Sequence, residues 1–89
     1  MTQSSKPVWR HDIGALTFVP AGHGGFCAVH RLAFRTLLQV PPAPEACLAY
    51  FAAHEATFRE AASAKIRTRR IAPGTNFHLT SRDVARLAK

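Results

Sequence analysis

The 89-residue chain lacks long apolar runs and contains only two cysteines. No stretch approaches the roughly 18 apolar residues of a membrane span, and the polar residues 1–7 have no apolar signal-peptide core. We therefore expect a cytoplasmic protein with no membrane partner. Cys27 and Cys47 are too few for a disulfide framework and neither belongs to a CxxC pair, so we expect both to be reduced and buried.

Acidic residues are also scarce. Five carboxylates stand against twelve lysines and arginines, a formal net charge of +7 with a pI near 10.8. Nucleic-acid binders have such a balance, but a compositional bias along the whole chain would produce it too. The chain also has no P-loop, no GxGxxG after a strand, no GxSxG and no HExxH. We expect no enzymatic activity, no catalytic residue and no cofactor.

Two groups of residues have the composition of a functional site but the wrong placement. Cys27 and His30 have the spacing of a zinc ligand pair, yet on a strand they point to opposite faces, and no second pair follows. His78, Ser81 and Asp83 lie too close in sequence to converge as a triad. Ser81 and Asp83 also suit the start of a helix. We predict neither a metal site nor a triad.

The chain length suits one domain around one core. Its hydrophobic fraction of 47% and charged fraction of 19% are ordinary for a globular protein. We expect residues 14–89 to form a single domain and residues 1–13 to be extended or poorly ordered. A chain of this size is only modestly stable alone, so dimerisation would help it.

Hydrophobic alternation predicts three strands. Residues 15–19 (ALTFV) and 26–30 (FCAVH) alternate, and they flank a glycine-rich turn over residues 20–25. These two segments are typical of a hairpin. Residues 75–79 (TNFHL) alternate again and predict a late strand that returns to the sheet.

Helical spacing predicts two short helices and one long helix. The short ones cover residues 31–38 and 82–87, the second with Thr80 or Ser81 as its cap. The long one covers residues 44–69, where Pro44 suits the first turn and no further glycine or proline occurs. The order of elements predicts an α+β fold, in which a small antiparallel sheet, the hairpin plus the late strand, packs against the long helix and the two short helices.

The predicted long helix has two different sides. An apolar stripe predicts its core-facing side and contains Cys47, Leu48, Phe51, Phe58, Ala62 and Ile66. The other side carries small residues, among them Ala49, Ala52, Ala53 and Ala56. Small side chains let another backbone approach closely, so this face is a candidate surface for a homo-oligomer. Exposed alanine is also simply good helix chemistry.

Basic residues concentrate near the end of the chain. Asp83 is the only acidic residue after Glu60. Clusters of this kind bind phosphate backbones, although a solvated basic helix end would look the same. The phenylalanines fall mostly at core positions, so no row of aromatic side chains is available to stack bases. The candidate polyanion-binding residues are Lys65, Arg67, Arg69, Arg70, Arg82 and Arg86.

Several short segments together match one family pattern. They are the glycine-led strand at residues 26–31, the Ala33-Phe34 pair, a helix carrying Ala61-Ala62 and Lys65-Ile66, and the closing residues 78–83. Over roughly residues 14–83 the chain resembles a family of small bacterial proteins known as domain of unknown function fourteen eighty-eight. The resemblance implies a compact α+β fold in the bacterial cytosol and brings no activity or catalytic residue with it.

Two functions are compatible with these features. The leading expectation is a non-enzymatic interaction or accessory protein able to self-associate. The alternative is a weak nucleic-acid-binding protein without sequence specificity, using the six basic residues. The sequence points to no particular small-molecule ligand.

Overall fold

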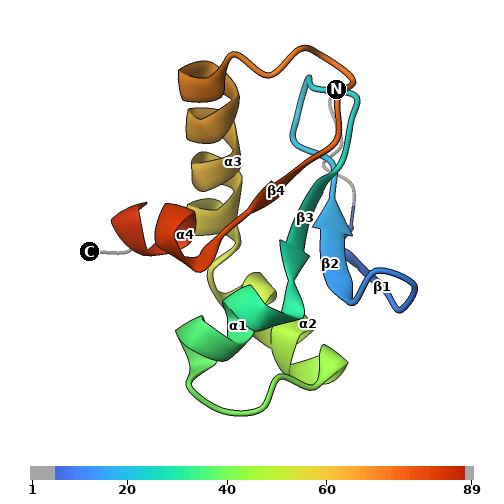
Figure 1. Ribbon diagram of the computed structural model, residues 1–89, viewed down its shortest axis with the longest axis vertical. Helices are drawn as coiled ribbons and strands as arrows, with labels where there is room; N and C mark the ends of the chain where they lie inside the picture. The colour runs from blue at the N-terminus through green and yellow to red at the C-terminus, as the bar shows by residue number, and fades with distance from the viewer. Residues whose placement is uncertain (1–5, 88–89) are drawn as a thin grey trace.

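The computed structural model describes residues 6–87, which form four strands and four helices in the order β1-β2-β3-α1-α2-α3-β4-α4 (Figure 1). The strands are β1 Val8–Arg10, β2 Ala15–Phe18, β3 Cys27–His30 and β4 Phe77–Leu79. They make one sheet in the order β1-β2-β3-β4, antiparallel for the first two pairs and parallel for β3 and β4. The predicted α+β class is confirmed, and the late strand does return to the sheet.

The sheet is mixed, whereas the sequence predicted an antiparallel one. Three helices connect β3 to β4 and bring the chain back to the end of the sheet at which β3 begins. A crossover of that length lets the next strand run in the same direction as its neighbour. Val29 therefore pairs with Leu79, and both face the core.

The predicted hairpin is confirmed as β2 and β3, with Leu16 opposite Val29. Its glycine-rich turn packs against the loop before β4. A Cβ atom on Gly25 would lie 2.7 Å from the backbone of Thr75, so only glycine fits there. The His23 ring bonds the Thr75 carbonyl oxygen through Nε2 at 2.8 Å, and the Gly74 N–H donates to the His23 carbonyl oxygen at 2.7 Å.

Strand β1 lies inside the segment expected to be extended or poorly ordered. Residues 8–10 are extended and pair with β2, placing Trp9 opposite Leu16 and partly against the core. At the turn after β1, Arg10 and Asp12 form an ion pair at 2.7 Å. Residues 1–5, the start of the same predicted segment, lie outside the described residues.

The helices are α1 Arg31–Leu38, α2 Pro44–Ala53, α3 Glu55–Arg69 and α4 Ser81–Leu87. The predicted helix over residues 44–69 is thus two helices, broken at His54, whose φ of −126° is not helical. A straight helix of that length would extend about 39 Å. The molecule measures 33 Å along its longest axis, so the break lets both halves stay on the core. None of the helices described for residues 6–87 combines the length and apolar character needed to cross a membrane.

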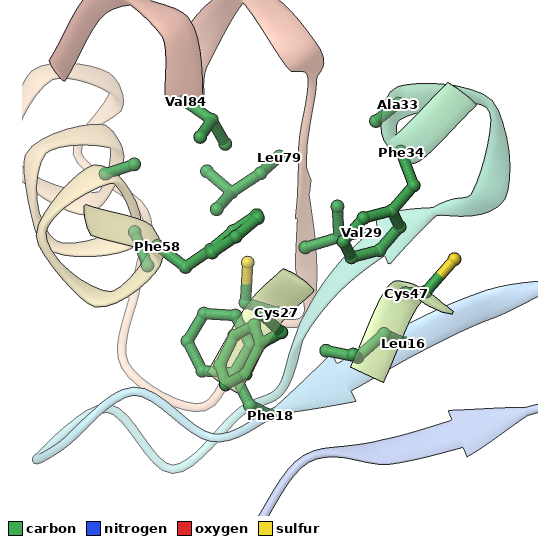
Figure 2. Close-up of a cluster of buried hydrophobic side chains, with 13 residues drawn as sticks. Leu16, Phe18, Cys27, Val29, Ala33, Phe34, Cys47, Phe58, Leu79 and Val84 are labelled. Atoms are coloured by element: carbon green, nitrogen blue, oxygen red, sulfur yellow. The ribbon is translucent and has the colours of Figure 1, made fainter. Parts of the chain in front are cut away.

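Aromatic side chains fill the core between the sheet and the helices (Figure 2). Phe58 of α3 lies at the centre, with its ring 5.8 Å from that of Phe34 and 5.1 Å from that of Phe51. Phe18 and Cys27 cover it from the sheet side, and both are fully buried. In the predicted apolar stripe, Cys47, Phe51, Phe58 and Ala62 are buried, while Leu48 and Ile66 are half-buried.

Candidate polyanion-binding site

Helix α4 starts with a reciprocal cap that fixes its first turn. The Asp83 N–H donates to Thr80 Oγ1 at 3.2 Å, and the Thr80 N–H donates to Asp83 Oδ2 at 2.9 Å. This pairing of a hydroxyl residue with an acidic residue three positions later is the arrangement of a capping box. Thr80, one of the two predicted caps, is therefore the residue that caps α4.

Lys65 ties α3 to this cap. Its Nζ donates to Asp83 Oδ2 at 2.8 Å and to the His78 carbonyl oxygen at 2.9 Å. The two side chains are only 17% and 18% exposed, so the ion pair is largely shielded from water. Lys65 thus joins three elements, α3, β4 and α4, which are far apart in sequence. We call this arrangement of Lys65, Thr80 and Asp83 the α3–α4 clamp.

The clamp determines the ionisation of Asp83. Burial of the carboxyl acts to raise the pKa of Asp83. Hydrogen bonds from the Lys65 ammonium group and from the Thr80 backbone and hydroxyl outweigh that burial, so the pKa lies below its ordinary value. The carboxylate is therefore ionised at neutral pH and matches the charge of Lys65.

A groove beside the clamp lies between α3 and α4. Figure 1 shows the two helices, with α4 beside the lower end of α3. It has a volume of about 420 Å³ and is lined by Lys65 and Arg69 on α3 and by Thr80, Ser81, Arg82, Asp83 and Arg86 around α4. A narrower hollow of about 90 Å³ shares Lys65, Arg69, Asp83 and Arg86 with it. We refer to both together as the α3–α4 groove.

Three arginines of the groove are available to a ligand. The side chains of Arg69, Arg82 and Arg86 form no ion pair or hydrogen bond with any residue between 6 and 87. All three are exposed. Among the described residues that line the groove, the one carboxylate belongs to Asp83 and is already bound to Lys65. The groove therefore presents uncompensated guanidinium groups on both of its walls.

The structure separates the six predicted residues into two sets. Lys65, Arg69, Arg82 and Arg86 line the groove. Arg67 lies two positions from Arg69, roughly opposite on the helix, and lines another hollow of about 270 Å³ with His23 and Ile71. Arg70 has the left-handed conformation with φ of 51° and ends α3, its N–H bonding the Ile66 carbonyl oxygen.

Sequence reasoning missed the hydroxyl groups at the site. Thr80 and Ser81 line the groove beside the arginines, and Thr68 lines its narrow hollow. The Thr80 hydroxyl already donates to Asp83 Oδ2 at 3.0 Å, and the Thr68 hydroxyl donates to the Lys65 carbonyl oxygen at 3.5 Å. Among the described hydroxyls of the groove, this leaves that of Ser81 to donate to a phosphate oxygen beside the guanidinium groups. The spacing of Thr80 and Asp83 could have indicated these hydroxyl groups from the sequence. It predicts that residues 80 and 81 lie at the start of α4.

Other reactive groups are buried in the core. Burial raises the pKa of Cys27 to about 12, so its thiol stays protonated at neutral pH and is a poor nucleophile. Burial also raises the pKa of Cys47. Both cysteines are unpaired and buried, as expected. Over residues 6–87, no three histidine, cysteine or acidic side chains gather closely enough to hold a metal ion.

Comparisons with known proteins found no match. No family model matches the chain, and neither a curated protein nor a solved structure does. The resemblance to domain of unknown function fourteen eighty-eight therefore stays a prediction.

Proposed function

We propose that this protein is a non-enzymatic nucleic-acid-binding domain that holds backbone phosphates in the α3–α4 groove. The observation that carries the proposal is the set of three arginines on the two walls of one groove, Arg69, Arg82 and Arg86, which have no side-chain partner among residues 6–87. Guanidinium groups bind phosphate oxygens through two parallel hydrogen bonds and stay charged at any physiological pH. A cytoplasmic protein meets such phosphates in DNA and RNA.

The uneven distribution of charge supports the same proposal. Residues 65–87 carry six basic side chains and one carboxylate, whereas residues 6–64 carry five basic side chains and four carboxylates. A uniform compositional bias would have spread the excess along the chain. Local excess of one sign raises the concentration of an oppositely charged partner near the surface and speeds its association.

Binding through phosphates would carry no sequence preference. Contacts to phosphate oxygens position a nucleic acid but do not distinguish one base from another. Helix α4, with only seven residues, is held against α3 by the clamp. It is therefore not free to enter a groove of the nucleic acid as a recognition helix does.

Self-association remains a separate prediction. Ala49, Ala52 and Ala53 of α2 and Ala56 of α3 are all exposed, as a packing surface would require. Light scattering over a concentration series tests it: a molar mass that rises towards that of a dimer supports the alanine-rich face. A constant monomer mass at high concentration would contradict it.

The nucleic-acid proposal is tested with two variants of equal net charge. R69Q/R82Q/R86Q removes three charges from the groove, and K6Q/R31Q/R35Q removes three exposed charges elsewhere. Fluorescence anisotropy at about 50 mM salt measures the affinity of each for labelled nucleic acid of about 20 base pairs. We expect the groove variant to lose most of its affinity and the control variant to keep most of it.

Two outcomes would contradict the proposal. One is the absence of binding by the wild-type protein at low salt. The other is an equal loss in both variants, which would show that net charge and not the groove attracts the nucleic acid. Circular dichroism of both variants confirms that they are folded.

A further inference from the structure

Among the described residues, no aromatic side chain lines the α3–α4 groove. Its described walls are formed by arginine, lysine, threonine, serine, aspartate, alanine and leucine side chains. Phe18, Phe34, Phe51 and Phe58 are fully buried in the core. Phe77 is half-buried and packs edge-on against His23, away from the groove. A base that reached the groove would find no flat ring on which to stack.

Stacking is what usually offsets the cost of binding a single strand. A flexible single strand loses conformational freedom when it is held in one path, and aromatic side chains compensate by stacking on its bases. A duplex does not need this compensation, because its backbone is already stiff over a length much greater than this protein. It also carries two phosphates for every base pair, which doubles the charge along its axis.

The walls of the groove are held in place by the protein itself. The Lys65 ammonium group bonds both Asp83 and the His78 carbonyl oxygen, and Asp83 closes the cap with Thr80. Arg69 and Arg86 therefore project from two helices whose spacing is set by the α3–α4 clamp. A preorganised backbone of this kind favours a ligand that is itself rigid, since only the arginine side chains must then be ordered on binding.

The arginines are also spaced along the walls to suit a regular backbone. Arg82 and Arg86 are four residues apart on α4, which places them about 6 Å apart along the helix axis. Successive phosphates of one strand advance about 3.4 Å along a duplex. A separation of about 6 Å is close to two such steps, so one wall can contact two phosphates of a single strand while Arg69 contacts that strand from the other wall.

We propose that the ligand of the α3–α4 groove is a double-stranded nucleic acid, bound through the phosphates of one of its strands. This inference rests on the proposed nucleic-acid-binding function. It adds a preference that charge alone does not specify, and it derives from the absence of a stacking surface beside three unpaired arginines.

The test compares a duplex with each of its own strands. Labelled DNA of about 20 base pairs and its two separate strands, chosen to form no hairpins, are titrated with the full chain by fluorescence anisotropy at about 50 mM salt. We expect the duplex to bind at least about ten-fold more tightly than either strand. An RNA duplex of the same sequence forms a second arm, and tighter binding of either duplex than of its strands supports the inference.

The outcomes separate this inference from the function on which it rests. Single strands that bind as tightly as the duplexes, with affinity still lost in R69Q/R82Q/R86Q, would overturn the preference and leave the proposed function in place. No binding of any duplex or strand would overturn both. The K6Q/R31Q/R35Q variant serves as the matched control and should keep the preference for duplexes.

Discussion

The two ends of helix α3 use arginine in opposite ways. Near its start, Arg59 bonds Glu55 at 2.7 Å, and its guanidinium lies 5.1 Å from the centre of the Phe18 ring. Near its end, Arg69 has no side-chain partner among residues 6–87 and lines the groove. The first arginine covers the core and the second faces an open groove. The difference shows that the surroundings of an arginine, and not its presence, decide whether it is available to a ligand.

The largest expected difference between the two ends of α3 is in how the affinity for nucleic acid depends on salt. With about three phosphate contacts, the affinity for a DNA duplex should fall about forty-fold between about 50 and 200 mM salt. The R69Q/R82Q/R86Q variant should show almost no dependence on salt, whereas R59Q should keep the full dependence. Anisotropy titrations at several salt concentrations measure the slope. An unchanged slope in the triple variant would show that other residues make the contacts.

Removing Lys65 should have the next largest effect, and it should be on stability. The K65M change leaves Asp83 half-buried without its ammonium partner, which should cost about 1 to 3 kcal/mol in the free energy of unfolding. Affinity for nucleic acid should fall as well, because α4 is no longer held at its distance from α3. Urea denaturation measures the stability. Its matched control is R69Q, which should leave the free energy of unfolding unchanged within about 0.5 kcal/mol.

Arg59 provides the converse test at the other end of α3. The R59Q change removes the ion pair with Glu55 and the contact with the Phe18 ring, so it should cost about 1 kcal/mol of stability. Affinity for a duplex should be unaltered, because Arg59 lies outside the groove. Urea denaturation and anisotropy on the same preparation measure both quantities. If R59Q lost affinity for the duplex but kept its stability, Arg59 would be a binding residue and not a residue that covers the core.

The smallest expected effect is the pH dependence contributed by Asp83. Its pKa is lower in the folded protein than its ordinary value near 3.9, so the ionised carboxylate stabilises the fold above that pH. This contribution is lost as the pH falls through the folded-state pKa. Compared with wild type, D83N should therefore be less stable at pH near 7, and the difference should shrink below about pH 3. Denaturation curves at both values measure it, and a constant difference would contradict this explanation.

Much of the fold was predictable because apolar spacing is a local property. The alternation of residues 15–19 and 26–30 predicted β2 and β3, and the spacing of Phe51 and Phe58 predicted buried positions. Strand β1 was missed because residues 6–10 (KPVWR) show no apolar alternation, and its extended form depends on pairing with β2. The break at His54 was also missed, since neither glycine nor proline marks it and the size of the core imposes it.

The cap of α1 is another feature that composition did not reveal. His30 Nδ1 accepts a hydrogen bond from the Leu32 N–H at 3.1 Å, a role more often filled by serine, threonine, asparagine or aspartate. The sequence predicts that His30 lies on the strand at residues 26–30, on the face opposite Cys27, and that it binds no metal. The structure places it at the end of β3, exposed, while Cys27 points into the core.

By itself, the sequence determined strands β2, β3 and β4, helices α1 and α4, most of the side chains that enter the core, and where the positive charge concentrates. Each of these follows from residues that are neighbours along the chain or one helical turn apart. Only the tertiary structure decided which of the basic residues are free. Asp83 neutralises Lys65 across eighteen positions, Arg67 points away from Arg69, and α4 brings Arg82 and Arg86 to the same groove. The physical reason is that ion pairing depends on distance through space, which the packing of α4 against α3 sets.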